Sequence, residues 1–291
     1  MSVRSGADWE LDYYSRPILE ADGKKRWELL ICSSPSPGEG VPSFRWVQTC
    51  PAGNVNSIWL REALEQAMAD AAQQGLGTPR RLRCWRGAMR TMVQRAAEGL
   101  GIELIPSRRC YALVEWLQER ETQVYPHEAG YLAGPLAPPP EPIRPVPLPL
   151  PETARGESWS WAQLSVADLR DADQWDIDFA GLIPLDADLK ADTPIPGIRL
   201  FGGPRALAIA GWVAGLEPVR LEIQARQLVL EAGMDDRWLL SDLPADGIEA
   251  ANEALRQTRA QAGGLQFLAV QASPSEQRFS GFWMLRDLPD S

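Results

Sequence analysis

The segment that decides the fold of the first half is residues 9–32, W-E-L-D-Y-Y-S-R-P-I-L-E-A-D-G-K-K-R-W-E-L-L-I-C. Two strand-like runs, 9–19 and 26–32, flank an Asp-Gly turn signal, which is typical of a β-hairpin. Residues 44–50, F-R-W-V-Q-T-C, follow a loop rich in proline and glycine and read as a third strand. The chain is therefore predicted to begin with an antiparallel meander.

After the meander the hydrophobic period changes to that of a helix. Asn56 or Ser57 can cap the first helix and Gly75 can end it. We expect helices over 56–74, 87–99 and 110–124, with strands over 80–86 and 102–106 between them. A meander leading into parallel strands with crossover helices is the element order of a ribonuclease H-like domain. We predict an α/β fold with such a domain over residues 1–134, although element order does not give function.

Nine prolines in residues 135–151 predict a stiff linker. The second domain is expected over 152–291 as a mixed α/β fold. Its predicted helix covers 246–262, capped by Asp246, and 166–198 reads as irregular and acid-rich. Its predicted strands cover 157–165, 206–214, 219–232, 237–243, 265–271 and 278–285.

Charge is spread unevenly over the 291 residues, whose net charge is -10. Residues 1–125 hold 16 lysines and arginines against 15 acids, whereas residues 126–291 hold 13 against 24. This difference supports two domains with different roles. Only the first half is a plausible partner for a polyanion.

The run T-P-R-R-L-R-C-W-R-G-A-M-R-T-M-V-Q-R, residues 78–95, is basic and contains no acid. Arginine offers a planar fork to phosphate and a flat face to bases, and Trp85 could stack on a base. A solvated charged face explains the same residues about as well. The candidate anion-binding arginines are Arg80, Arg81, Arg83, Arg86, Arg90, Arg95, Arg108 and Arg109.

Carboxylates are the ligands that a ribonuclease H-like nuclease needs for its two metal ions. Asp12 lies where the first acid would be, and Glu62 or Glu65 could be a second. The strand over 80–86 then offers arginine where another acid is required, which argues against a nuclease. Asp12, together with Arg16 and Glu28, is better interpreted as a cross-strand ion-pair set.

Neither a metal nor a cofactor is expected from the remaining residues. The cysteines, Cys32, Cys50, Cys84 and Cys110, have no C-x-x-C spacing and are expected to be buried thiols. His127 is the single histidine, so the sequence offers few residues from which a zinc site or a Ser/His/Asp triad could be built. The acidic run 168–178 lacks the glycine and terminal glutamate of an EF-hand loop. It is interpreted as a solvated acidic loop.

The N-terminus shows no apolar signal region and no Arg/Ser-rich transit peptide. No apolar run approaches the 18 residues of a membrane span. A cytoplasmic protein without a membrane span is therefore expected.

Several blocks of the sequence together resemble the Tab/Atab-type RNA-binding proteins of cyanobacteria and chloroplasts. The resemblance extends from residue 9 to residue 286. The blocks are W-E-L-D-Y-Y-S-R-P-I-L (9–19), K-K-R-W-E-L-L-I-C (24–32), N-S-I-W-L-R-E-A-L (56–64), S-R-R-C-Y-A-L-V-E-W-L-Q-E-R (107–120), V-Y-P-H-E-A-G-Y (124–131) and the C-terminal S-G-F-W-M-L-R.

This resemblance implies a protein that binds single-stranded A/U-rich RNA and acts in translation or assembly of photosystem reaction-centre subunits. Translation machinery or photosystem assembly proteins are the implied protein partners. The family's W-L-L tripeptide is matched by Trp283, Met284 and Leu285, of which Trp283 and Leu285 are carried over as RNA-binding candidates. The family offers no catalytic residues to transfer, and the lack of a transit peptide resembles the cyanobacterial form.

Two alternatives remain open beside a non-catalytic RNA-binding protein. One is a metal-dependent nuclease of ribonuclease H-like fold. The other is an assembly factor that binds only proteins, through its acidic second domain.

Overall fold

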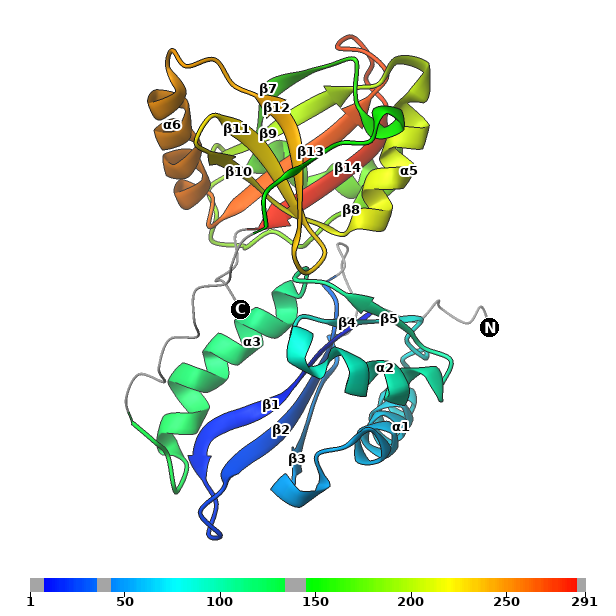
Figure 1. Cartoon of the computed structure of the whole chain (residues 1–291), viewed down its shortest axis with the longest axis vertical. Helices are drawn as coiled ribbons and strands as arrows, with labels where there is room; N and C mark the ends of the chain where they lie inside the picture. The colour runs from blue at the N-terminus through cyan, green and yellow to red at the C-terminus, as the bar shows by residue number, and fades with distance from the viewer. Residues whose placement is uncertain (1–7, 36–42, 134–144, 287–291) are drawn as a thin grey trace. The chain divides into compact units, whose positions relative to one another are not determined.

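Residues 8–35, 43–133 and 145–286 are described by a computed structural model (Figure 1). The chain divides into two compact units, the first extending to Ile143 and the second starting at Arg144. Each unit is a mixed α/β structure. Of the proline-rich stretch 135–151, residues 135–144 lie outside the described ranges, while Leu148–Pro149 forms the short strand β6 of the second unit.

The first unit is built on a five-stranded sheet of order β3-β2-β1-β4-β5. β1, β2 and β3 pair antiparallel, and β4 and β5 continue the sheet in parallel with β1. The predicted meander and the alternation of strands and helices after it are confirmed. The elements are β1 (Trp9–Leu19), β2 (Lys25–Ser33), β3 (Arg45–Cys50), α1 (Ser57–Gln73), β4 (Arg81–Cys84), α2 (Arg90–Glu98), β5 (Glu103–Pro106) and α3 (Tyr111–Glu119).

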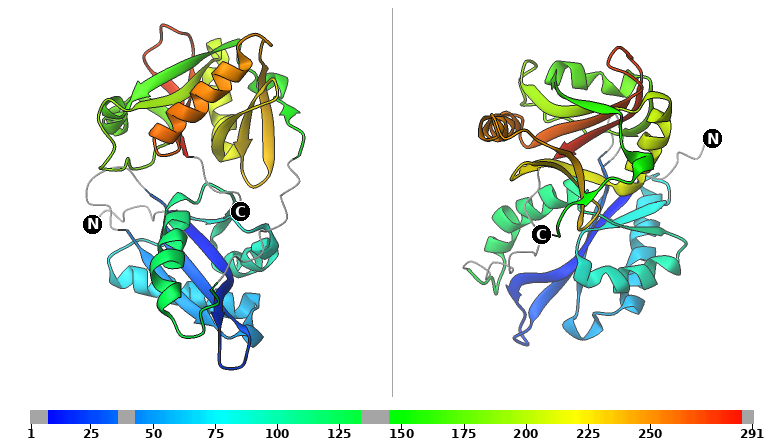
Figure 2. Two further views of the ribbon diagram at one scale, coloured as in Figure 1. Left: turned by 90° about the vertical axis from the view of Figure 1, so that its left-hand side faces the viewer. Right: turned by 45° about the horizontal axis from the view of Figure 1, so that its top comes forward.

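Side-chain alternation along β1 gives the first sheet two different faces. Trp9, Leu11 and Tyr13 enter the apolar core that α1 and α2 cover. The opposite face carries polar side chains and is covered by α3, as the left view of Figure 2 shows. Asn56 caps α1, since its side-chain oxygen accepts hydrogen bonds from the backbone N–H groups of residues 58 and 59, each at 2.9 Å. All four cysteines are buried free thiols, as expected.

The segment V-Y-P-H-E-A-G-Y returns the chain to the first hairpin. The backbone N–H of Leu19 donates to the carbonyl oxygen of Gly130 at 2.8 Å, and Ile18 forms a bridge with Tyr131. Gly130 has a φ of +83°, and a Cβ atom there would lie 2.2 Å from the Leu19 carbonyl oxygen. Only glycine fits this position, because both the φ angle and the approach of the backbone exclude a side chain.

We expect Gly130→Ala to destabilise the protein by about 3 kcal/mol or more, because strain at positive φ adds to a backbone clash. Gly101 is the matched control, since its φ is +70° but no atom lies within 4 Å of a Cβ placed there. Gly101→Ala should cost about 1 kcal/mol. Urea unfolding of both variants measures the difference, and equal losses would contradict the proposed clash.

The second unit contains a five-stranded sheet of order β7-β9-β13-β14-β8 and a four-stranded sheet of order β10-β11-β12-β6 (Figures 1 and 2). One apolar core joins the first of these sheets to α5, α6 and the second sheet. The elements are β7 (Ser158–Ser165), α4 (Val166–Arg170), β8 (Ile177–Gly181), β9 (Pro194–Phe201), α5 (Ala206–Leu216), β10 (Pro218–Gln224), β11 (Gln227–Ala232), β12 (Asp236–Asp242), α6 (Ile248–Gln261), β13 (Leu265–Gln271) and β14 (Phe279–Arg286).

Several predictions for this unit are wrong. Asp246 does not cap α6, whose N-cap is Gly247 without a side-chain hydrogen bond, and the stretch 166–198 contains β8 as well as part of β9. Residues 206–214, expected as a strand, lie in helix α5, because an unbroken apolar run fits a buried helix as well as a buried strand. β9, expected to be irregular, is a central strand despite two prolines. Its pairing with β13 begins only at Gly197, so the prolines precede that ladder. A Cβ on Gly197 would lie 2.4 Å from the Phe267 carbonyl oxygen, which explains the glycine.

The acidic stretch after β7 is more than a solvated loop. Ser165 and Asp168 form a capping box at the start of α4, which lowers the pKa of Asp168 through hydrogen bonds from Ser165. Leu169 and Ala172 are buried, while the aspartates of the run 168–178 are exposed. In the parts of the chain that the structure describes, no helix has the length and apolar character needed to cross a membrane.

Candidate nucleic-acid interface

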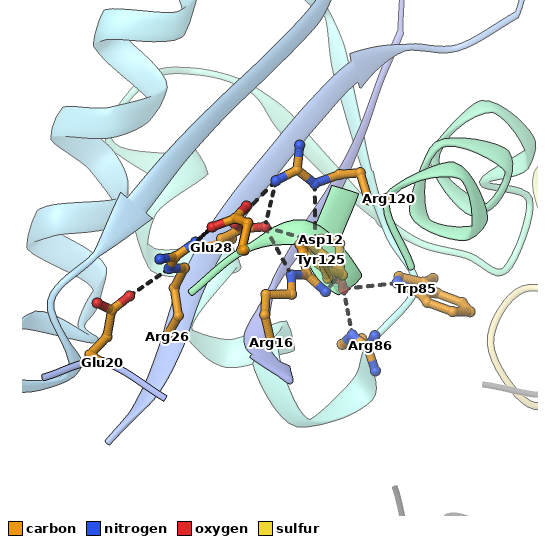
Figure 3. A network of polar contacts seen from close by, with 10 residues as sticks. Asp12, Arg16, Glu20, Arg26, Glu28, Trp85, Arg86, Arg120 and Tyr125 are labelled. Carbon is orange, nitrogen blue, oxygen red and sulfur yellow. Dashed lines mark hydrogen bonds and ion pairs between the residues drawn. The ribbon is translucent and has the colours of Figure 1, made fainter. Parts of the chain in front are cut away.

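The polar face of the first sheet is organised around Asp12. This residue lies on β1 and its carboxylate is fully buried. Arg16 contacts it at 2.8 Å, Arg86 Nε donates to it at 2.5 Å, and the indole Nε1 of Trp85 donates at 2.9 Å (Figure 3). Burial by itself raises the pKa of Asp12, but the two arginines and the hydrogen bonds from Arg86 and Trp85 lower it overall. The carboxylate is therefore held in its charged form.

Glu28 on β2 extends the network away from Asp12. Arg16 lies 3.4 Å from its carboxylate, Arg120 donates to both carboxylate oxygens at 3.1 and 3.2 Å, and the Tyr125 hydroxyl donates at 2.8 Å (Figure 3). Burial is the main cause that raises the pKa of Tyr125, to about 12, so this hydroxyl keeps its proton and acts as a donor. The expected cross-strand ion-pair set of Asp12, Arg16 and Glu28 is confirmed.

A π-helical turn brings Arg120 and Tyr125 into this network. The turn covers Arg120–Val124 directly after α3, and a 3-10 turn, Tyr125–His127, follows it. A π turn inserts one extra residue into the helical repeat and so changes the direction of the side chains that follow. The guanidinium of Arg120 also lies 5.0 Å from the Tyr125 ring centroid. The end of α3 is thereby fixed to β2.

The arrangement around Asp12 differs from a metal site. Its contacts are a tryptophan N–H and two guanidinium groups, which are cationic or hydrogen-bond donors and cannot coordinate a metal ion. Glu62 and Glu65 are exposed on α1, which covers the other face of the sheet. Within residues 8–35, 43–133 and 145–286, no group of three His, Cys, Asp or Glu side chains could hold a metal.

Arg86 connects the network to the surface. Its side chain is 25% exposed, whereas Asp12 is fully buried. The guanidinium carbon lies 4.1 Å from the ring centroid of Tyr14 and 4.9 Å from that of Trp85. Tyr14 itself is 37% exposed. Trp85 is buried at 8% exposure, so it supports Arg86 rather than presenting a ring to solvent.

The predicted arginines fall into different environments. Arg81 pairs with Glu103 at 3.3 Å, and Arg83 pairs with Asp8 at 3.3 Å. Arg109 is buried with its guanidinium 5.2 Å from the Tyr111 ring centroid, and Arg108 is half-buried. The exposed members of the set are Arg80, Arg90 and Arg95.

These three exposed arginines are the members of the predicted set whose charges are least compensated by neighbouring side chains. Arg80 precedes β4, while Arg90 and Arg95 lie on α2. In the described part of the chain, none of the three side chains forms a hydrogen bond or an ion pair. Their charge is therefore available to an anion from outside the molecule.

Trp283 and Leu285 lie in the core of the second unit. Their exposures are 3% and 0%, and both belong to the apolar cluster under α5 and α6. The Trp283 ring occupies the space beside Gly281, where a Cβ would lie 2.2 Å from it. Met284 points to the opposite, equally buried face of β14. The tripeptide thus packs both faces of the sheet, which gives it a structural role here.

Glu10 is a third buried carboxylate on the polar face, after Asp12 and Glu28. Its carboxylate accepts a hydrogen bond from the backbone N–H of Leu113 at 2.8 Å, in the first turn of α3, where helix N–H groups lack internal partners. Burial raises its pKa to about 7, although the Leu113 bond and the nearby Arg83 and Arg109 act in the opposite direction. Glu10 thereby connects β1 to the start of α3.

Two family models match this chain, one over each half. Residues 8–120 match the family described as "RNA-binding protein Tab2/Atab2 N terminal", and residues 138–286 match "RNA-binding protein Tab2/Atab2, C-terminal domain". The chain belongs to the Tab2/Atab2 family of RNA-binding proteins. The resemblance seen in the sequence blocks is therefore confirmed for both halves of the chain.

Two plant members of the Tab2/Atab2 family match nearly the whole chain. The Zea mays protein named "Protein TAB2 homolog, chloroplastic" is 34% identical over 295 residues, covering 97% of this chain and 72% of its own length. The Arabidopsis thaliana protein of the same name is 34% identical over 297 residues, covering 97% and 75%. Both names place the plant proteins in the chloroplast, so neither bears on the cytoplasmic location expected from the sequence.

Among solved structures, one similar chain belongs to the simian T-cell lymphotropic virus intasome in complex with PP2A regulatory subunit B56 gamma. It is 10% identical, covers 81% of this chain and 78% of its own, and gives a TM-score of 0.24. A score this low establishes no common fold.

The sequence analysis did not single out three residues of the polar face, namely Glu10, Tyr14 and Arg120. Alternation along β1 carries a signal for the first two, because Glu10, Asp12 and Tyr14 share one face of a strand. Arg120 carries no such signal, since its direction depends on the π turn.

We expect the stability of the protein to fall as the pH rises from 4.5 to 7, in part because of Glu10. The folded carboxyl keeps its proton up to about pH 7, whereas the unfolded one loses it near 4.5. The folded state therefore binds more protons in this window, and its advantage is lost as the pH rises. The contribution is about 3 kcal/mol.

The Glu10→Gln variant should remove this pH dependence, because glutamine does not titrate and still accepts the Leu113 hydrogen bond. Denaturant unfolding at pH 5 and pH 8 measures the effect. Glu65→Gln, at an exposed helix position, is the control and should behave as the parent protein does. A parent-like pH profile for Glu10→Gln would contradict this assignment.

Proposed function

We propose that this protein binds single-stranded A/U-rich RNA without cutting it. The observation that carries the proposal is membership of both halves in the Tab2/Atab2 family of RNA-binding proteins. Arg80, Arg90 and Arg95 are exposed and have no ion pair among the described residues. They support the proposal, since arginine neutralises phosphates and releases their counterions. The preference for A/U-rich sequences follows from the family resemblance and is tested by comparing A/U-rich with G/C-rich single strands.

We infer a ribonuclease H-like topology for the first unit. The sheet order β3-β2-β1-β4-β5, with β4 and β5 parallel to β1, supports this inference. The environment of Asp12 supports the absence of catalysis, because Arg16 and Arg86 occupy the sides of the carboxylate. Two-metal hydrolysis requires carboxylates that are free to coordinate cations.

We further propose that RNA binding serves the translation or assembly of photosystem reaction-centre subunits. The two plant relatives are named as chloroplastic proteins, which supports a photosynthetic setting. Proteins of the translation or assembly machinery are the partners that this role requires. Crosslinking in the native cells, followed by sequencing of the bound RNA, tests the role directly and would contradict it if photosystem messages are not enriched.

Replacing Arg80, Arg90 and Arg95 together by Gln should weaken RNA binding and reduce its salt dependence. Each lost phosphate contact on a single strand lowers the slope of log K against log salt by about 0.7. The slope should therefore fall by up to about 2 in magnitude. Fluorescence anisotropy with a labelled single-stranded RNA at several salt concentrations measures it.

The matched control replaces Arg170, Lys190 and Arg256 by Gln. These residues are exposed on the acidic second unit, and the change in net charge is the same. The control should keep the parent slope. An unchanged slope in the first variant, or an equal reduction in both, would exclude the three arginines as the RNA-binding surface.

No cleavage of labelled RNA is expected in the presence of Mg²⁺ or Mn²⁺, for the parent protein or for Asp12→Asn. The variant should instead lose about 3–5 kcal/mol of stability, because Arg16 would keep a buried charge after losing its closer partner, with only Glu28 at 3.4 Å left. Gel analysis of the RNA and urea unfolding measure the two effects. Cleavage by the parent protein that Asp12→Asn abolishes would identify a nuclease.

A further inference from the structure

We propose that Arg86 and Tyr14 form a subsite for one nucleotide of single-stranded RNA. The terminal amino groups of Arg86 bind a phosphate, and the exposed ring of Tyr14 stacks on the adjoining base. The inference rests on the proposed RNA-binding function and adds a defined position for RNA on the polar face of the first sheet.

The guanidinium of Arg86 is fixed in one orientation. Its Nε donates to Asp12 at 2.5 Å, and Asp12 is itself held by Arg16 and by the indole of Trp85. The guanidinium carbon also lies over the rings of Tyr14 and Trp85, at 4.1 and 4.9 Å from their centroids. A planar fork held in this way loses little conformational freedom when it binds a ligand.

The terminal nitrogen atoms of Arg86 remain available. Within the described residues, Nη1 and Nη2 form no hydrogen bond, since the bond and the ion pair of this side chain both use Nε. Two parallel N–H groups at one edge of a guanidinium match the geometry of two phosphate oxygens. Arg86 therefore donates to the buried Asp12 carboxylate through Nε, and its terminal N–H groups are left for a ligand.

Exposure within the network also favours an anion at Arg86. Three guanidinium groups, those of Arg16, Arg86 and Arg120, are paired with only two carboxylates, those of Asp12 and Glu28. These five groups carry one positive charge in excess, and Arg26 with its partners Glu20 and Glu128 adds one negative charge farther along the network (Figure 3). Its members differ in exposure, at 4% for Arg16, 12% for Arg120 and 25% for Arg86. Of these three guanidinium groups, that of Arg86 is the one that an external anion reaches most readily.

Tyr14 supplies the aromatic surface beside this charge. It follows Asp12 on the same face of β1, and its side chain is 37% exposed. Its ring centroid lies 4.1 Å from the Arg86 guanidinium carbon. Stacking of unpaired bases on aromatic rings next to a cationic group is the usual means of holding single-stranded RNA. A base-paired duplex would not offer such a base.

The test uses the full chain and a single-stranded RNA that carries 5-iodouridine. Irradiation should attach the RNA to the peptide that contains Tyr14. In parallel, anisotropy should show that Tyr14→Ala weakens binding by roughly tenfold, the size expected for one lost base stack. Tyr14→Phe keeps the ring and should stay within about twofold of the parent protein.

Salt dependence separates the two halves of the subsite. Tyr14→Ala should keep the slope of log K against log salt, because it removes no phosphate contact. Arg86→Lys keeps the charge but loses the planar fork, and it should weaken binding severalfold at constant slope. Thermal melting of each variant reports whether the fold persists. Trp161→Ala, an aromatic residue 44% exposed on β7, is the control and should bind as the parent does.

Parent-like affinity of a folded Tyr14→Ala variant, or adducts found only in other peptides, would overturn the subsite while leaving RNA binding intact. Loss of affinity in Tyr14→Phe equal to that in Tyr14→Ala would also overturn it, since stacking needs only the ring. Failure of the parent chain to bind single-stranded RNA would overturn the proposed function itself.

Discussion

Burial of the Asp12 and Glu28 carboxylates is the constraint on which the first unit depends. A carboxylate removed from water is unfavourable unless cations and hydrogen-bond donors surround it. The donors come from elements far apart in the chain: Arg16 from β1, Arg86 from the connection after β4, and Arg120 from the π turn after α3. The network therefore joins the hairpin to the crossover region and to α3. Loss of one member leaves a buried opposite charge with fewer partners.

In our proposal, the same network is the reason why the first unit binds RNA without cutting it. A buried carboxylate such as that of Asp12 needs cations beside it. In a two-metal enzyme metal ions supply this positive charge, and here guanidinium groups supply it. A guanidinium cannot activate a water molecule as a bound metal ion does. It can, however, hold a phosphate, and Arg86 is the member of the network with a free edge for it. In our proposal, binding is retained on this face while hydrolysis is not.

The second unit shows how a family signature can be structural. Trp283 and Leu285 face one core and Met284 faces the other side of the same strand, so the tripeptide fixes β14 between two packed layers. Gly281 and Gly197 make room for a tryptophan ring and for a neighbouring backbone, respectively. Each of these glycines leaves space that a large neighbour fills, so this core is close-packed.

The sequence by itself determined the order of the strands and helices in the first unit, the cross-strand pairing of Asp12, Arg16 and Glu28, and the family. Period, turn signals and capping residues are local, and they can be read without the fold. The tertiary structure decided which arginines are paired, because Arg81 and Arg83 form ion pairs with acids on other segments, whereas Arg80, Arg90 and Arg95 form none with the residues that the structure describes. It also decided that Trp85 is buried, that 206–214 is a helix, and that Tyr14 lies beside Arg86. Pairing and burial depend on residues distant in sequence, so no local pattern could have shown them.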